Sequence, residues 1–397
     1  PALDQTFRYD NLHRLTRAEG GYGALEFEYA DNGNLLARGG VDLRYEGTAP
    51  HAATHLGDQL LSYDDAGRLR TVSGEGDLEV GTWAYDGHGR SRSFTTESGA
   101  RQESLYNYLG DRTIKRDYDS NGKLVNETFY FGKTVEVRDG QLRKWVFVGG
   151  KRVAEVPQKL PGDGYEDVPL AAFMLALLGL FAGWRARRTI RLRAVAGARR
   201  NLAPLLSCLV AVMVFANACR DDDDGGTTGG ELEITSATQF YVEDRLGSSS
   251  LVLNHEGQVV GRSATTPYGR SWFEHRDEDS RTNPYEFTGK ERDAVSGGLH
   301  FGARVYLAEL GRFSTPDWAF LLDGAASSLE TPRFRNPYNY ARNNPLMHVD
   351  PDGQWDWESV AADALAYGSQ AVDAVNNVVS GAVDEASMGA TKYVRDK

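Results

Sequence analysis

Short runs of alternating hydrophobic and polar residues fill the first third of the chain, and turn-forming residues separate them. In most copies a Tyr is followed by Asp and stands four residues before a Gly. Asp favours a turn by bonding nearby backbone amides, Gly supplies a positive φ, and the alternating flanks are typical of half-buried strands. The pattern therefore predicts antiparallel β-hairpins. The clear copies are FRYDNLHRL (7–15), FEYADNGNL (27–35), LSYDDAGRL (61–69), WAYDGHGR (83–90) and RDYDSNGKL (116–124).

These hairpins form a repeat, because weaker copies around Tyr45 and Tyr106 occupy the intervals between the clear ones. One such unit cannot bury its own apolar face, so neighbouring units must stack into an array. We interpret the repeated Tyr, Asp and Gly residues as structural, since each has a turn or packing role. Binding of carbohydrate by exposed tyrosines is the alternative interpretation.

A different pattern begins after the Pro- and Gly-rich segment 157–167. Residues 168–184 and 201–219 contain no charged side chain, whereas 185–200 contains seven arginines and no acidic residue. A membrane-spanning helix needs about 20 apolar residues, and basic residues mark the cytoplasmic side. The pattern predicts a transmembrane hairpin over 168–219 with a cytoplasmic basic loop and with both β regions on the extracytoplasmic side, at the cell surface or secreted. A pair of buried core helices is the alternative.

The two cysteines, Cys208 and Cys219, both lie in the second apolar segment, so they indicate neither a disulfide framework nor a zinc site. The same segment is similar to a basic and apolar leader that ends at Cys219, which suggests lipidation of this cysteine as a further alternative. The acidic, Gly-rich run 220–231 that follows is interpreted as a solvated linker.

Composition excludes several classes of protein. With 44 Gly in 397 residues and a mean hydropathy of −0.48, the chain fits neither a helical bundle, a collagen-like fibre nor a wholly membrane-embedded transporter. The net charge of −12 repels phosphate backbones, so no nucleic-acid partner is predicted. The chain begins at Pro1 without a visible signal peptide, and we interpret it as a piece of a longer protein.

Common cofactor motifs are missing from the sequence. It contains no P-loop, no GxSxG elbow and no Rossmann fingerprint, so we predict no cofactor. His51 and His55 are four residues apart, but Gly, Pro, Ala and Thr around them indicate a loop, so we predict no metal site.

The Tyr-Asp-x-x-Gly-Arg-Leu unit resembles the YD repeat of the RHS family, and a later series of motifs resembles the RHS repeat-associated core. The motifs occur in the order DRLGSSSLVLNHEGQVV (244–260), TPYGR (266–270), NPYEFTGKERDAVSGGLHFGARVY (283–306), LGRFSTPD (310–317) and NPYNYARNNPLMHVDPDG (336–353). The expected fold class is mainly β, a YD-repeat hairpin ribbon with an RHS core, interrupted by the helical apolar hairpin. The expected divisions are 1–156 repeat region, 157–167 linker, 168–219 hairpin, 220–231 linker, 232–353 core and 354–397 variable C-terminal segment.

The resemblance implies a function in toxin delivery. RHS ribbons spiral into a hollow shell around a C-terminal polypeptide, commonly a toxin, and related chains form the cocoon of insecticidal toxin complexes. The implied partners are a C-terminal toxin cargo and either an immunity protein or a shell partner subunit. A non-enzymatic surface-adhesion or carbohydrate-binding repeat protein is the alternative, because it would use the same repeats.

The resemblance also implies self-cleavage by an aspartyl protease. In the family the core cuts after a DPxGL motif, and the matching acids here are Asp317 and Asp350, with the cut between Gln354 and Trp355. Two carboxylates held close share one proton, so one polarises the scissile carbonyl while the other activates water. Trp318 replaces the usual Pro and Gln354 replaces Leu, which leaves the enzymatic activity open.

The C-terminal segment 354–397 has Val and Leu at near-helical spacing among Ala, Gly and Asp, which predicts one or two weakly amphipathic helices. It occupies the position of the variable cargo in the family, but its sequence indicates no target.

Overall fold

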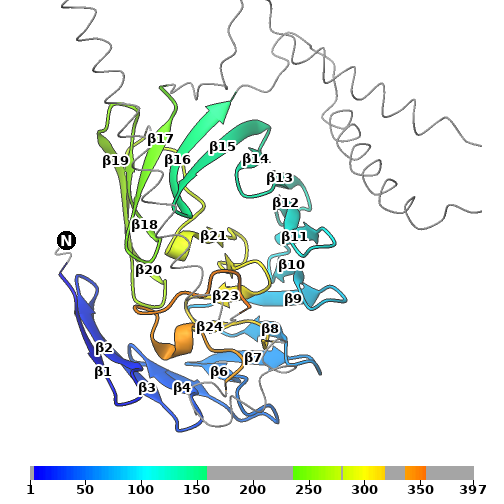
Figure 1. Cartoon of the computed structure of the whole chain (residues 1–397). Helices are drawn as coiled ribbons and strands as arrows, with labels where there is room; N and C mark the ends of the chain where they lie inside the picture. The colour runs from blue at the N-terminus through cyan, green and yellow to red at the C-terminus, as the bar shows by residue number, and fades with distance from the viewer. Residues whose placement is uncertain (1–3, 159–235, 279, 318–335, 355–397) are drawn as a thin grey trace, which may run out of the picture. The chain divides into compact units, whose positions relative to one another are not determined.

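The computed structural model describes residues 4–158, 236–278, 280–317 and 336–354 (Figure 1). All of these except Gln158 lie in one compact unit. Within these ranges, no helix is long and apolar enough to cross a membrane. The hairpin expected over 168–219, with Cys208 and Cys219, lies outside the described residues and stays a prediction.

Most described residues belong to a ribbon of antiparallel strands. Neighbouring strands pair in chain order from β1 through β15, and again from β16 through β20. The strands are β1 (Thr6–Tyr9), β2 (Leu15–Gly20), β3 (Gly23–Tyr29), β4 (Leu35–Arg38), β5 (Val41–Arg44), β6 (His55–Leu56), β7 (Gln59–Tyr63), β8 (Leu69–Ser73), β9 (Gly81–Tyr85), β10 (Ser91–Thr96), β11 (Arg101–Tyr106), β12 (Arg112–Tyr118), β13 (Leu124–Phe131), β14 (Val135–Arg138), β15 (Gln141–Val148), β16 (Lys151–Gln158), β17 (Gln239–Glu243), β18 (Ser249–Leu253), β19 (Val259–Thr265) and β20 (Ser271–Arg276). The expectation of a mainly β hairpin ribbon is confirmed.

The ribbon continues into the region that the sequence motifs assign to the core. Strand β17 pairs with β16 across the long segment between them, and β17 to β20 extend the same sheet. A second sheet begins only at Glu291 and consists of β21 (Glu291–Arg292), β22 (Leu299–His300), β23 (Val305–Leu307) and β24 (Arg312–Phe313). Two short 3-10 segments, η2 (Phe287–Gly289) and η5 (Ala341–Asn343), flank it. We use "core" below for residues 285–317 and 336–354.

Side chains of the YD motif link each hairpin turn to the next hairpin. At the turn before β8, Asp64 Oδ1 accepts backbone N–H groups of Ala66 and Arg68, both at 3.0 Å, and its Oδ2 accepts Arg68 Nε at 2.7 Å. The Arg68 guanidinium lies 5.0 Å from the ring centre of Tyr85, whose hydroxyl donates to Leu69 O at 2.6 Å. The interpretation of the repeated Tyr and Asp residues as structural is therefore confirmed at this turn.

The same arrangement recurs along the ribbon. Arg14 and Arg90 pair with Asp10 and Asp86 at the equivalent positions of their own turns. They stack on the tyrosines of the following hairpins, Tyr29 and Tyr106, whose hydroxyls bond backbone carbonyls of the preceding strand. Because the same Asp–Arg–Tyr contacts repeat, one local sequence motif is enough to form successive hairpins of a long sheet.

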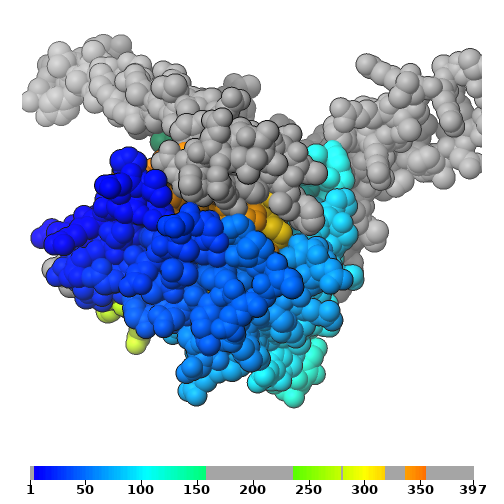
Figure 2. Space-filling model, turned by 90° about the horizontal axis from the view of Figure 1, so that it is seen from below, coloured from blue at the N-terminus to red at the C-terminus, as the bar shows by residue number. Residues whose placement is uncertain are grey.

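The ribbon curves around the core, and Figure 1 shows β21, β23 and β24 enclosed by its strands. One buried apolar cluster joins the two parts. Its ribbon members include Leu15, Leu35 and Leu69, which follow the repeat turns, and its core members include Tyr306, Phe313 and Tyr340. Figure 2 shows the N-terminal strands (blue) as a continuous surface on one face, with core residues (yellow and orange) visible only at its rim.

Candidate functional site

The structure brings Asp317 and Asp350 together around one arginine. Asp317 follows β24, and Asp350 lies near the end of the described core; both carboxylates are buried. The Nη2 atom of Arg304 is 3.1 Å from Asp317 Oδ2 and 3.2 Å from Asp350 Oδ2. Two carboxylates that are 33 positions apart in sequence therefore contact the same nitrogen.

Arg304 also holds the backbone that precedes the expected cut. Its Nε donates to Gly353 O at 2.5 Å and its Nη1 donates to Pro337 O at 3.1 Å. The guanidinium lies 3.7 Å from the ring centre of Phe313, which covers it on one face. Sequence reasoning did not select Arg304, although the FGARVY motif contains it.

The electrostatics of this site allow one proton to be kept there. Burial raises the pKa of the Asp350 carboxyl, although the Arg304 guanidinium opposes the shift. Asp350 Oδ1 also accepts the Gly353 N–H at 2.7 Å, which fixes the turn around it. The positive charge of Arg304 offsets part of the cost of burying two carboxylates at this site.

The expected cleavage position begins one residue beyond these contacts. Gln354 is exposed, and its backbone N–H donates to Asp352 Oδ1 at 2.9 Å. Trp355, on the other side of the expected cut, lies outside the described residues.

The two histidines considered as metal ligands make separate contacts. His51 Nδ1 lies 2.8 Å from Asn34 Oδ1, and His55 Nδ1 lies 3.0 Å from Thr54 Oγ1. In the part of the chain that the structure describes, no group of three or more His, Cys, Asp or Glu side chains is arranged to hold a metal ion.

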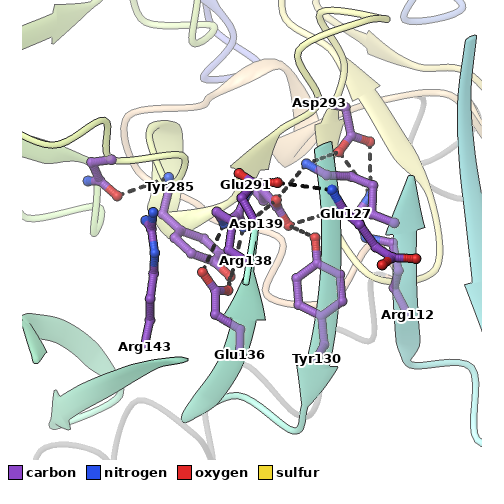
Figure 3. A network of polar contacts seen from close by, with 12 residues as sticks. Arg112, Glu127, Tyr130, Glu136, Arg138, Asp139, Arg143, Tyr285, Glu291 and Asp293 are labelled. Carbon is purple, nitrogen blue, oxygen red and sulfur yellow. Dashed lines mark hydrogen bonds and ion pairs between the residues drawn. The ribbon is translucent and has the colours of Figure 1, made fainter. Parts of the chain in front are cut away.

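A second cluster of buried charges joins the core to β12–β14, and we call it the ionic seam (Figure 3). Glu291 accepts Arg112 Nη2 at 2.6 Å, Lys115 Nζ at 2.7 Å and Arg138 Nη2 at 2.8 Å. Arg112 Nη1 also donates to both carboxylate oxygens of Asp293, each at 2.9 Å. Its members are Arg112, Lys115, Tyr130, Glu136, Arg138, Tyr285, Glu291 and Asp293.

The buried acids of the ionic seam depend on the cations beside them. Burial alone would raise the pKa of Glu291, but Lys115, Arg112 and Arg138 hold it well below its usual range. The pKa of Asp293 is lowered for the same reason, since Arg112 and Lys115 outweigh its burial. These acids are two positions apart in the GKERDAVSG motif, whose role sequence reasoning did not identify.

The core also contacts three ribbon turns through their carbonyl oxygens. Asn344 Nδ2 donates to His13 O at 2.8 Å, Asn343 Nδ2 to Gly33 O at 3.2 Å, and the Tyr338 hydroxyl to Gly67 O at 2.6 Å. The three acceptors occupy the same left-handed position of their turns, with φ of 59°, 84° and 76°. A Cβ on Gly67 would lie 2.6 Å from the Tyr338 hydroxyl oxygen, so this turn needs Gly for its φ and for this contact.

Comparison with known proteins gives one family match. Residues 232–346 match the family model described as the Teneurin YD-shell. Toxin subunit YenC1 of Yersinia entomophaga is 32% identical over 128 residues, which are 32% of this chain and 12% of that protein. The tRNA3(Ser)-specific nuclease WapA of Bacillus spizizenii is 23% identical over 390 residues, covering 91% of this chain and 16% of that protein. Teneurin-3 of Danio rerio is 28% identical over 119 residues, 30% of this chain and 4% of that protein.

Solved structures with a similar fold are those of toxin complexes. The Photorhabdus luminescens Tc holotoxin pore matches with a TM-score of 0.56 and 17% identity over 89% of this chain and 15% of that chain. The crystal structure of TcdB2-TccC3-Cdc42 matches with a TM-score of 0.50 and 16% identity over 92% of this chain and 16% of that chain. The chain therefore spans between an eighth and a sixth of the first relatives and structures that it matches. These matches confirm the resemblance to RHS and YD-repeat shell proteins.

Proposed function

We propose that this chain, an RHS and YD-repeat shell protein by its motifs and fold, contributes to a shell that encloses or presents a C-terminal cargo and cuts itself after Gln354. The observation that carries the proposal is the meeting of Asp317, Asp350 and Arg304 at one buried site beside Gly353. Three side chains from separate motifs converge on the backbone that leads to the expected cut, which a purely structural ion pair would not require.

The proposed reaction is hydrolysis of the Gln354–Trp355 peptide bond. Water attacks the carbonyl carbon of Gln354 and gives one proton to the Asp317 carboxylate, while protonated Asp350 gives its proton to the carbonyl oxygen. The C–N bond then breaks, the proton on Asp317 passes to the departing nitrogen, and the hydroxyl proton returns to Asp350. The raised pKa of Asp350 supports its part as the acid.

Arg304 has two parts in this proposal. Its positive charge balances the ionised carboxylate in a buried site, and its bonds to Gly353 O and Pro337 O keep the backbone close to both acids. It therefore acts as a positioning residue, because its contacts are with the acids and with the backbone before the cut.

The cargo in this proposal is the polypeptide that follows Gln354. Relatives are described by name as a toxin subunit and as a tRNA-specific nuclease, and both descriptions suit a shell with a toxic C-terminal passenger. We extend the proposal to an immunity protein or a partner shell subunit, since a toxin made inside a cell requires containment.

Residues 168–219 enter the proposal as a membrane anchor that keeps the ribbon and core outside the cytoplasm, at the surface or secreted. If they form a membrane hairpin, the chain remains in the membrane pellet after alkaline carbonate washing, and deletion of 168–219 releases it. Recovery of the intact chain in the soluble fraction would contradict the anchor but not the shell.

The self-cleavage proposal is tested on the full chain with its natural downstream sequence. N-terminal sequencing after incubation is expected to find a new terminus at Trp355, and Asp317→Asn is expected to remove it. Gln354→Leu is expected to speed cleavage, because Leu is the family's residue before the cut. A new terminus elsewhere, or one that survives Asp317→Asn, would contradict the proposal.

A further inference from the structure

The segment before the expected cut is held by its backbone carbonyls. Pro351 O accepts Lys290 Nζ, Asp352 O accepts the backbone N–H of Ala303 at 3.0 Å, and Gly353 O accepts Arg304 Nε. Three successive carbonyls are therefore fixed, and two of the three donors are long cationic side chains.

The backbones of the two segments are in direct contact. A Cβ on Gly302 would lie 2.9 Å from Asp352 O, and a Cβ on Gly353 would lie 3.1 Å from both Arg304 N and Phe301 Cβ. Both positions also have φ in the left-handed region, at 96° and 76°. Because the two backbones lie this close, a small shift of the segment changes these contacts, and the donors that bind its carbonyls set its register.

Lys290 is the donor that reaches the segment from a different part of the core. It follows η2, and its Nζ lies 5.1 Å from the ring centre of Phe301, in addition to its bond with Pro351 O. The next residue, Glu291, is fixed to β12 and β14 by the ionic seam. The place of Lys290 is thus determined by the docking of the core on the ribbon.

We propose that Lys290 is a positioning residue for the self-cleavage, which fixes the register of residues 351–353 through the Pro351 carbonyl. This inference rests on the proposed function and deepens it, because it assigns a part to a residue outside the two acids and Arg304. Lys290 acts through the backbone and takes no proton in the reaction. Its loss removes the restraint on the Pro351 carbonyl, while the contacts of Arg304 with Asp317 and Asp350 remain.

The test measures the cleavage rate of full-length Lys290→Met, which keeps an apolar stem and removes the donor. We expect a rate about 10- to 100-fold lower, since a misplaced scissile bond costs about that much. Lys290→Arg, which restores a cationic donor of similar reach, is expected to recover most of the rate. Lys144→Met changes an exposed lysine on β15 and is the matched control, with no expected effect. A wild-type rate in Lys290→Met overturns the inference.

A second measurement separates this inference from the proposed function. In an Asp317→Asn chain, which is expected to stay intact, hydrogen exchange reports on the amides of Ala303 and Gly353. We expect Lys290→Met to raise exchange at these two amides while β21–β24 stay protected. Loss of protection throughout β21–β24, with no rescue by Lys290→Arg, would show that Lys290 only stabilises the core. If the wild-type chain is never cut, the proposed function fails, and this exchange result still decides whether Lys290 holds the segment.

Discussion

The core meets the ribbon through two regions of opposite chemistry. Along the first strands, the contact is the apolar cluster around Leu69, Tyr306 and Phe313, which we call the apolar seam. Along β12–β14, it is the ionic seam, in which Arg112 and Glu291 meet with less than a twentieth of either side chain exposed. Both regions join the core to the ribbon. Comparing them distinguishes the contacts that stabilise the docked core from those that fix its position on the ribbon.

The apolar seam depends on shape and area, whereas the ionic seam depends on partners. Burial of apolar side chains contributes roughly in proportion to their area and tolerates small shifts. A buried ion pair offsets its desolvation only when its geometry and its partners are complete. We therefore infer that the apolar seam supplies most of the free energy of docking, while the ionic seam fixes where Glu291, and with it Lys290, lies on the ribbon.

The largest effect is expected from removing one side of the ionic seam. Arg112→Met leaves the carboxylates of Glu291 and Asp293 buried beside fewer positive charges, which we expect to lower the free energy of unfolding by about 3–5 kcal/mol. Urea unfolding followed by tryptophan fluorescence measures it. Arg101→Met is the control, because Arg101 is exposed and pairs with half-buried Glu103 on the same strand, and its expected cost is below about 1 kcal/mol. Equal costs for both variants would mean that the seam has no special role.

Truncation in the apolar seam is expected to cost somewhat less. Leu69 is fully buried, and Leu69→Ala removes its side chain and leaves a cavity, at about 3 kcal/mol. Leu60→Ala on neighbouring β7, where Leu60 is 52% exposed, is the matched control, with a cost below about 1 kcal/mol. The two seams also differ in salt dependence. A cost that changed with salt for Leu69→Ala would contradict the assignment of this seam as apolar.

Acid is expected to weaken the ionic seam selectively. Because the folded-state pKa values of Glu291 and Asp293 are lowered, their contribution is present above the ordinary carboxyl range, near pH 4, and is lost as the pH falls through the folded values. Arg112→Met has already lost much of that contribution. The difference in unfolding free energy between wild type and Arg112→Met should therefore narrow between pH 7 and pH 3. A difference that is constant over this range would contradict the charge assignment.

The smallest effect is expected where the core contacts a single turn. Tyr338→Phe removes the hydrogen bond to Gly67 O and keeps the ring that lies 6.0 Å from the ring of Tyr63, at a cost of about 1 kcal/mol. Tyr108→Phe, at an exposed turn residue, is the control and should leave the unfolding midpoint unchanged. A larger loss of unfolding free energy for Tyr108→Phe than for Tyr338→Phe would contradict a stabilising role of the turn contacts.

The apolar seam was largely predictable from the sequence, and the ionic seam was not. The YD hairpins are local, since Asp64, Gly67 and Arg68 form their turn within five residues, and the Leu that follows three of the turns, Leu15, Leu35 and Leu69, lies on the buried face. Arg112 and Glu291 are 179 positions apart, and their contact follows from the register of the core on the ribbon. No periodicity distinguishes such an arginine from one on the surface.

The candidate site also has residues that the sequence indicated and residues that it did not. The resemblance named Asp317 and Asp350, and the structure places both beside Arg304. Arg304 and Lys290 could not be selected from the sequence, because their parts depend on backbone carbonyls of Gly353 and Pro351, which no side-chain motif encodes. The sequence feature that relates to this contact is the pair Gly302 and Gly353. A Cβ at either position would lie against the backbone of the opposite segment.

The central claim is that the buried acid pair cuts the chain, and a matched pair of substitutions tests it most directly. Asp350→Asn keeps an oxygen that accepts the Gly353 N–H but supplies neither proton nor base, whereas Asp65→Asn changes an exposed acid in a ribbon turn. Intact mass is measured over time for wild type and both variants, each with its natural downstream sequence. The account predicts that wild type and Asp65→Asn divide between Gln354 and Trp355 at similar rates while Asp350→Asn stays whole. Division of Asp350→Asn at the wild-type rate, or a wild-type chain that stays whole, would contradict it.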